Sequence, residues 1–358
     1  MFIMNERIEL PIQLSDIECV SKCWIFNRLA IIKTSPYYRD WIASHFNLVA
    51  TSGFQFDFEN AKPAYYEEIL MRKPVNMFQL TKQNIVDKLK GYLRDGYYVN
   101  IMLKPYPDLD YIHEIILYGF DDTTKKFIAV GIDNRIFHSK QVTYAYMEEG
   151  VERIQEELCK DVKKNMIRSL TFQYMVTLFK LNPSFSPENC VFEAYQKVEK
   201  ELNGERYNLH FGTSFAEYAE QPFGYRYTGL CVLDIFKQML AMEIRGEKFE
   251  PWFSGITSGI KTLVEHRQMM KQTLDYIMEK WKLAVTDNAR TSVKAYEECS
   301  EVAETWLNLC LKYEITKDIN LLKRIVTKIP EIYEREKECL ETFMKEGMDL
   351  EKLNRYYI

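Results

Sequence analysis

The stretch HEIILYGFDDTTKKFIAVGID, residues 113–133, decides the fold of the first half of this chain. An apolar run from Ile112 to Phe120 is followed by the polar residues 121–124 and then by a second apolar run from Phe127 to Ile132. Two short runs rich in β-branched and aromatic residues, separated by a polar turn, are typical of paired strands. We therefore expect an antiparallel hairpin over residues 112–132.

The hairpin is flanked by further elements of both kinds. Alternating apolar residues from Tyr98 to Leu103 predict a strand, and Tyr174 to Leu181 is expected to add a later strand to the same sheet. Apolar residues recur at helical spacing from Val20 to Ile32, and a further helix is expected over about 187–202. The first part of the chain is therefore predicted to be α+β, with an antiparallel sheet and an early buried helix.

The pattern changes near Gly204 to long, charged, amphipathic segments with few Gly or Pro. The segments Thr262 to Lys282, Ser292 to Tyr313 and Asn320 to Lys345 predict three long helices. We accordingly divide the chain into an α+β domain over 1–204 and a helical domain over 205–358.

Composition narrows the class of function. The 358 residues suffice for two domains, and a net charge of −5 without a run of Lys and Arg argues against nucleic-acid binding. With no apolar run of bilayer length and no signal-peptide pattern, we expect a cytoplasmic protein without a membrane partner. The eight cysteines form no C-x-x-C pair, and no Gly-rich phosphate loop is present. We therefore expect reduced thiols and neither a metal nor a bound cofactor.

Four residues in the first part suggest a nucleophilic site. Cys19 lies at the predicted helix start, where free N–H groups and the helix dipole stabilise a thiolate. His113 begins one hairpin strand and is placed to accept the thiol proton, and Asp133 ends the next strand, where it can orient the imidazole. Gln13, just upstream, can donate an amide N–H to an oxyanion. We expect a Cys-His-Asp triad with Gln13 completing the site.

Other residues are weaker candidates. Cys23 lies one turn after Cys19, but a position inside the helix would deprive it of the helix-end N–H groups. Asp121, Asp122 and Asn134 are alternatives to Asp133 for orienting the imidazole, although the two aspartates lie in a turn expected to point away. The remaining histidines have no cysteine or carboxylate pattern around them and are expected to be structural or surface residues: His45, His138, His210 and His266.

The same residues carry a resemblance to a known family. Gln13 stands six residues before Cys19, as in the bacteriocin-leader peptidases of the C39 type, which are papain-like cysteine enzymes. The segment from His113 to Asp122, continued through residues 127–130 to Asp133, resembles the histidine strand of the branch similar to the N-terminal domain of butirosin biosynthesis protein H (BtrH). Val20 departs from the Gly that follows the nucleophile in the leader peptidases. The resemblance implies a papain-like, C39-like catalytic domain.

The resemblance also implies a reaction. Members of that branch are acyltransferases of natural-product assembly lines, where an acyl or peptidyl group passes from the phosphopantetheine thioester of a carrier protein, through the cysteine, to an amine. It thus implies an ATP-independent amide synthase in nonribosomal antibiotic biosynthesis, with a carrier protein and a small amine, of diamine or amino-sugar type, as partners. A cysteine peptidase or amidase, with water as acceptor, is the alternative, and a non-enzymatic binding module is a third reading.

Recognition of an acidic carrier protein would need a basic surface near the thiol. The candidates for such a rim lie near the predicted helix and strand ends: Lys22, Arg28, Arg72, Lys73 and Lys104. Opposite charges would then steer the two proteins together.

Overall fold

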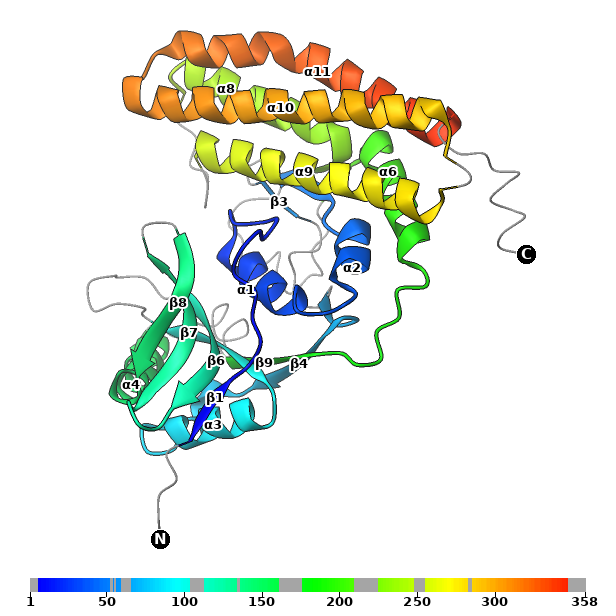
Figure 1. The fold of residues 1–358 in the computed structure, drawn as a ribbon. Coiled ribbons are helices and arrows are strands. Elements are labelled where there is room, and N and C mark those ends of the chain that lie inside the picture. Colours follow the sequence, from blue (N-terminus) through cyan, green and yellow to red (C-terminus); the bar gives the residue numbers. More distant parts are fainter. Residues whose placement is uncertain are drawn as a thin grey trace. The chain divides into compact units, whose positions relative to one another are not determined.

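The computed structural model describes residues 6–51, 54, 56–58, 66–103, 113–133, 136–160, 176–208, 225–247, 255–282 and 285–346 (Figure 1). Its described residues form helices and antiparallel sheets, so the α+β class is confirmed. The chain divides into two compact units. Unit 1 comprises residues 1–36 and 63–185, and unit 2 comprises residues 37–62 and 186–358.

Unit 1 is built on one antiparallel sheet in the order β4-β9-β5-β6-β7-β8, with β1 paired to β6. The predicted hairpin is confirmed as β6 (His113–Asp121) and β7 (Lys126–Asp133), and the predicted flanking strands are β5 (Tyr98–Leu103) and β9 (Val176–Leu181). The remaining strands are β1 (Arg7–Glu9), β4 (Leu70–Val75) and β8 (Ile136–Thr143).

The hairpin carries one irregularity, between Leu117 and Gly119. At this point β1 runs alongside β6, and a Cβ atom on Gly119 would lie 2.5 Å from the main-chain oxygen of Ile8. Only glycine leaves room for so close an approach of two backbones.

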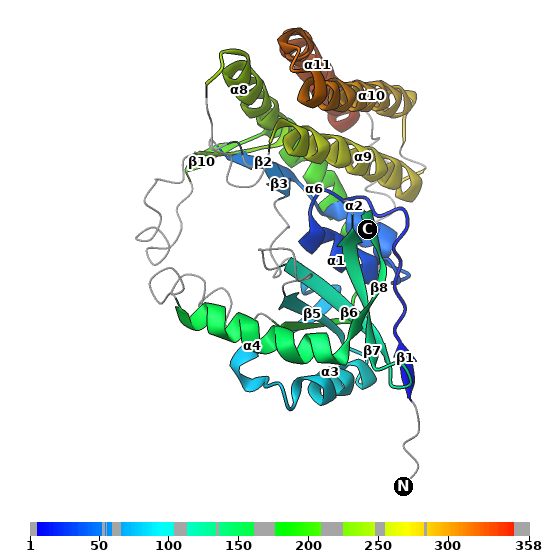
Figure 2. The same cartoon turned by 90° about the vertical axis from the view of Figure 1, so that its left-hand side faces the viewer.

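The two faces of this sheet are covered by different helices (Figure 2). The side chains of Val99, Ile101, Ile115 and Leu117 belong to one buried cluster with residues of α3 (Ile85–Arg94) and α4 (Tyr144–Lys160). Successive side chains of a strand point to opposite faces of the sheet, so the residues between these four face the other side. That face receives α1 (Cys23–Ile32), whose Phe26 ring stacks on Phe137 of β8 at 3.8 Å between centroids. A short 3₁₀ helix, η3 (Met77–Gln79), precedes α3.

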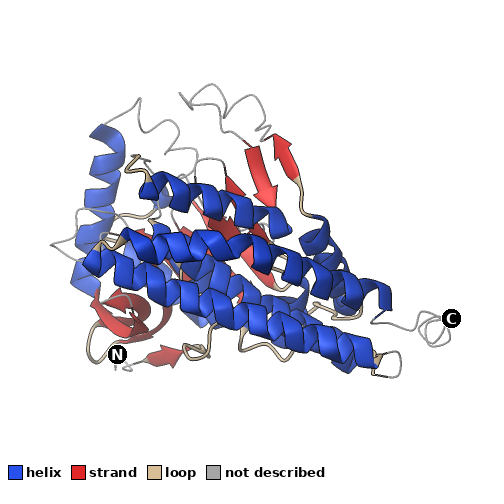
Figure 3. Cartoon of the chain, turned by 90° about the horizontal axis from the view of Figure 1, so that it is seen from above, coloured by secondary structure: helices blue, strands red, loops and turns tan. Residues whose placement is uncertain are grey.

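Unit 2 is dominated by long helices, which lie side by side in Figure 3. The three helices predicted from the sequence are confirmed as α9 (Ile256–Lys280), α10 (Asp287–Thr316) and α11 (Ile319–Glu346). The other helices are α2 (Tyr38–Ser44), α6 (Cys190–Asn203), η4 (Gly229–Cys231) and α8 (Val232–Ile244). A small antiparallel sheet in the order β10-β11-β2-β3 completes the unit, formed by β10 (Arg206–Asn208), β11 (Tyr225–Thr228), β2 (Leu48–Thr51) and β3 (Phe56–Phe58).

The division of the chain differs from one cut at Gly204 in two places. Residues 37–62 belong to unit 2, because β2 pairs with β11 and the Thr273 hydroxyl of α9 donates to the main-chain oxygen of Ala43. Residues 186–204 also belong to it, since α6 packs on α9. Both contacts join segments far apart in the chain, which local sequence patterns do not encode. No helix in the described ranges is long and apolar enough to span a membrane.

Candidate functional site

Cys19 lies in unit 1, in the segment that leads into α1. The helix begins at Cys23, and Lys22 is its N-cap residue with extended dihedral angles (φ −128°, ψ 111°). The prediction that Cys19 opens the helix is therefore wrong. The backbone is still extended at Lys22, and the helix begins only at Cys23, four residues after Cys19. The Cys19 side chain is fully buried, with its Sγ 3.8 Å from the Ser21 hydroxyl oxygen.

Cys23, and not Cys19, occupies the first position of α1. The expectation that Cys23 lies inside the helix is wrong, so its position does not disfavour it as a nucleophile. Its electrostatic surroundings disfavour it instead. Burial, reinforced by the negative charge of Glu114, raises the pKa of the Cys23 thiol to about 12. A thiol with that pKa remains protonated near neutral pH and is a poor nucleophile.

The backbones of His113 and Asp133 lie on neighbouring strands. The cross-strand pairs of the hairpin run from Asp121 opposite Lys126 to Ile116 opposite Val130. Beyond this point His113 pairs with Leu103 of β5, and Asp133 pairs with Ile136 of β8. His113 and Asp133 therefore lie on neighbouring strands, but no cross-strand pair of the described ladder joins them. The side chains of His113 and Asp133 lie outside the described part of the structure, as does Asn134.

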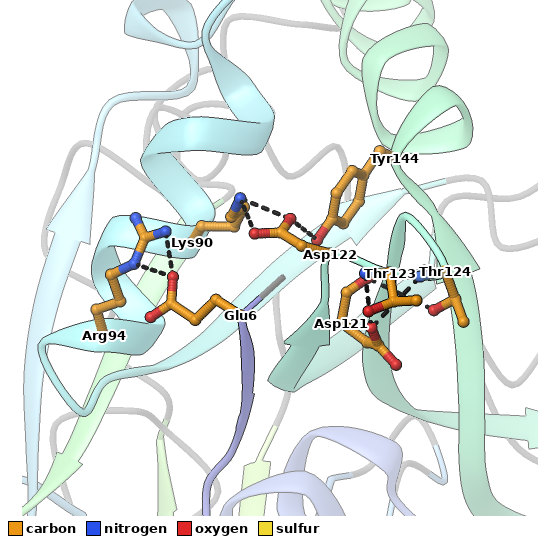
Figure 4. A network of polar contacts seen from close by, with 8 residues as sticks. All are labelled: Glu6, Lys90, Arg94, Asp121, Asp122, Thr123, Thr124 and Tyr144. Carbon is orange, nitrogen blue, oxygen red and sulfur yellow. Dashed lines mark hydrogen bonds and ion pairs between the residues drawn. The ribbon is translucent and has the colours of Figure 1, made fainter. Parts of the chain in front are cut away.

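Asp122 is held away from this role by a polar network (Figure 4). Its carboxylate accepts hydrogen bonds from Lys90 Nζ at 2.7 Å and from the Tyr144 hydroxyl at 2.9 Å. Burial favours the protonated acid, but these two contacts outweigh it and hold the pKa of Asp122 below its usual value. Asp122 is thus a structural anion that ties the hairpin turn to α3 and α4.

Asp121 is engaged in its own turn. Its Oδ1 accepts hydrogen bonds from the main-chain nitrogens of Thr123 at 2.8 Å and Thr124 at 3.3 Å (Figure 4). This arrangement is a turn in which the aspartate caps the N–H groups that follow it. Both aspartates of the turn are therefore engaged in structural contacts, which disfavours them as partners for the imidazole.

Gln13 is anchored away from the start of α1. Its main-chain N–H donates to the oxygen of Ala30, which lies two turns, or ~10 Å, along the helix from Cys23. Its side-chain amide donates to the Ser15 hydroxyl at 2.6 Å. The structure does not bring the Gln13 amide to Cys19, and an oxyanion role would require it to leave Ser15.

The polar residue of β6 that reaches α1 is Glu114, which the sequence patterns did not single out. Its carboxylate lies 3.8 Å from the Arg28 guanidinium, and both side chains are at most 10% exposed. The guanidinium also lies over the rings of Tyr66 and Phe179, at 5.6 and 5.3 Å from their centroids. This contact fixes α1 on the strand that begins with His113. The sequence feature that could have identified Glu114 is an acidic residue near the start of an otherwise apolar strand.

The predicted basic rim is wrong for two of its members. Arg28 is buried against Glu114, and Lys22 is 5% exposed with its ammonium over the Trp24 ring. Arg72 is paired with Glu67 at 2.8 Å, and Lys104 lies outside the described residues. Because the Lys22 and Arg28 side chains are buried, they are not available to steer an incoming protein.

The donor groups of the described residues do not form a metal site. No set of three or more His, Cys, Asp or Glu side chains in those ranges is arranged to hold a metal ion. Comparison with known proteins adds no relative, since no protein-family model matches the chain and no curated protein matches it. The case for an activity therefore comes from the residues of this chain alone.

Proposed function

We propose that this protein is a cysteine-dependent acyltransferase of papain-like type, with Cys19 as nucleophile, His113 as base and Asp133 as its orienting partner. One observation carries the proposal. Cys19 is a fully buried thiol in the segment entering α1, and α1 packs on β6, the strand that begins at His113 and lies beside β7, which ends at Asp133.

The reaction follows from these groups. His113 removes the Cys19 proton, and the thiolate attacks the carbonyl carbon of a thioester, such as that on the phosphopantetheine of a carrier protein. The donor thiol leaves with a proton, and an acyl-Cys19 thioester remains. An amine then attacks the acyl carbon, His113 takes the amine proton, and the Cys19 sulfur leaves as an amide forms. The thioester is already activated, so ATP is not needed.

Burial of the thiol favours an amine over water as the acceptor. An acyl-cysteine is hydrolysed wherever water reaches it, so transfer to an amine requires a site that excludes solvent. The zero exposure of Cys19 meets that requirement. The second candidate is a cysteine peptidase or amidase with the same three residues, in which water attacks the acyl-enzyme.

The proposal is tested by intact-protein mass spectrometry. The full chain is incubated with an acyl-pantetheine thioester, and the acylated cysteine is located by peptide mapping. We expect an adduct on Cys19 that an added diamine releases at least tenfold faster than buffer does. Cys19→Ala should form no adduct, and His113→Ala should form it at least a hundredfold more slowly, as expected for loss of a general base.

Cys23→Ala is the matched control, since its thiol lies one turn away and is expected to be protonated. It should acylate at the wild-type rate. An adduct on Cys23 would overturn the assignment of the nucleophile. Release of the Cys19 adduct by water as fast as by amine would favour the amidase instead.

A further inference from the structure

One lysine ties the segment that carries Cys19 to the far end of α1. Lys33 is the C-cap residue of this ten-residue helix, whose first residue is Cys23. Its ammonium donates a hydrogen bond to the main-chain oxygen of Asp16 and lies 3.9 Å from the Glu18 carboxylate. Lys33 therefore contacts two of the three residues that directly precede Cys19.

The backbone at one of these two anchor points is strained. Asp16 has a φ of +56°, in the left-handed region that residues with a Cβ atom rarely adopt. Such a conformation persists where the surrounding contacts hold it, and it is concentrated near functional sites. The hydrogen bond from Lys33 supplies a contact of this kind. If that bond is removed, we expect Asp16 to relax and the residues after it to shift.

A buried stretch of chain follows directly. Ile17 is 8% exposed and Cys19 is fully buried, whereas Asp16 is exposed. Glu18 lies between the two buried residues, and its side chain is 10% exposed. Burial raises the pKa of the Glu18 carboxyl, while the charge of Lys33 acts against this rise. Lys33 thus favours the ionised form of the residue next to the thiol.

We propose that Lys33 is a positioning residue for the nucleophile: by holding Asp16 and Glu18, it sets the place of the Cys19 thiol before the start of α1. This inference rests on the proposed acyl transfer. Lys33 touches neither the substrate nor the thiol in this scheme and acts through the chain from Asp16 to Cys19. A thiol displaced by about 1 Å reacts on the order of a hundredfold more slowly. The expected consequence is a slower acylation step with unchanged binding of the thioester.

The test compares Lys33→Met, which removes the ammonium, with Lys33→Arg, which keeps a cation. Acylation of Cys19 in the full chain is measured over a range of acyl-pantetheine concentrations, so that the saturating rate and KM are separated. We expect Lys33→Met to lower the saturating rate by about tenfold or more, with KM changed by less than about twofold. Lys33→Arg should recover most of the rate. Lys82→Met is the matched control: Lys82 pairs with Glu152 of the same unit at 3.7 Å, and its loss should leave the rate unchanged.

Amide hydrogen exchange tests the anchor without any acyl transfer. Residues 14–20 should exchange about tenfold or more faster in Lys33→Met than in wild type, while β6 keeps its wild-type rate. An unchanged exchange rate or an unchanged saturating rate in Lys33→Met would overturn the proposal. Equally faster exchange in β6, or an equal loss of acylation in Lys33→Arg, would also overturn it, since either result indicates a general structural role. Faster exchange of residues 14–20 beside a wild type that forms no Cys19 adduct would support the anchor and refute the acyl transfer.

Discussion

Replacing Glu201 by Gln should change how the stability of the protein depends on pH. Glu201 of α6 and His266 of α9 are 4% and 1% exposed, and Glu201 Oε2 lies 3.4 Å from His266 Nε2. Neither atom has a hydrogen-bond partner among the described residues. Burial, followed by the charge of Glu336, raises the pKa of Glu201 from 4.5 to about 8. The folded protein therefore keeps this carboxyl protonated where the unfolded chain ionises it.

The sign follows from proton binding. Between pH 4.5 and about 8 the folded state holds one more proton at Glu201 than the unfolded state, so this group's contribution to stability falls as pH rises. The slope is ~1.4 kcal/mol per pH unit, which amounts to about 5 kcal/mol over the whole window. Lys197, whose pKa burial lowers to about 7, also titrates in this range. The charge of Glu201 raises the Lys197 pKa against burial, so the Gln variant loses this coupling together with the carboxyl proton.

The assay is urea denaturation of wild type and Glu201→Gln at pH 5, 6, 7 and 8. We expect the free energy of unfolding of the variant, relative to wild type, to rise by ~1.4 kcal/mol for each pH unit. Glu199→Gln, an exposed change in the same helix, should differ from wild type by at most ~0.5 kcal/mol at every pH. A Glu201→Gln difference that stays constant from pH 5 to 8 would refute the reasoning.

Two further predictions concern stability. Arg267→Met should destabilise the protein by ~3–5 kcal/mol in urea denaturation, because the Glu336 carboxylate is then buried without its cation. In the wild type this carboxylate is 1% exposed and lies 2.9 Å from the Arg267 guanidinium. Adding Glu336→Leu should restore most of the lost stability, and an Arg267→Met variant as stable as wild type would contradict the prediction. Gly229→Ala should cost more than ~2 kcal/mol, because φ is +55° and the new Cβ would lie 2.3 Å from the Glu201 main-chain oxygen. Gly246→Ala, with φ +72° but no atom within 4 Å, should cost ~1 kcal/mol in the same urea denaturation, and equal losses for the two variants would contradict the close approach at Gly229.

Local sequence patterns determined the elements that lie close together in the chain. The hairpin of β6 and β7 follows from two short apolar runs separated by a polar turn. The strand β5 follows from alternating apolar residues, because a strand with one buried face needs that period. The helices α9, α10 and α11 follow from apolar residues at helical spacing. The hairpin also sets His113 and Asp133 on adjacent strands, which is as far as local pattern extends into the proposed site.

Tertiary structure decided what depends on distant partners and on burial. The sequence expectation placed Cys19 at the helix start, whereas Lys22 ends the extended segment and α1 begins at Cys23. His266 was expected to be a structural or surface residue, and only packing against α6 shows it buried beside Glu201. The reason is physical: the period of apolar residues reports which face of an element is buried, but not which distant group desolvates or neutralises a charge. Those contacts, and the pKa values that follow from them, exist only once the chain has folded.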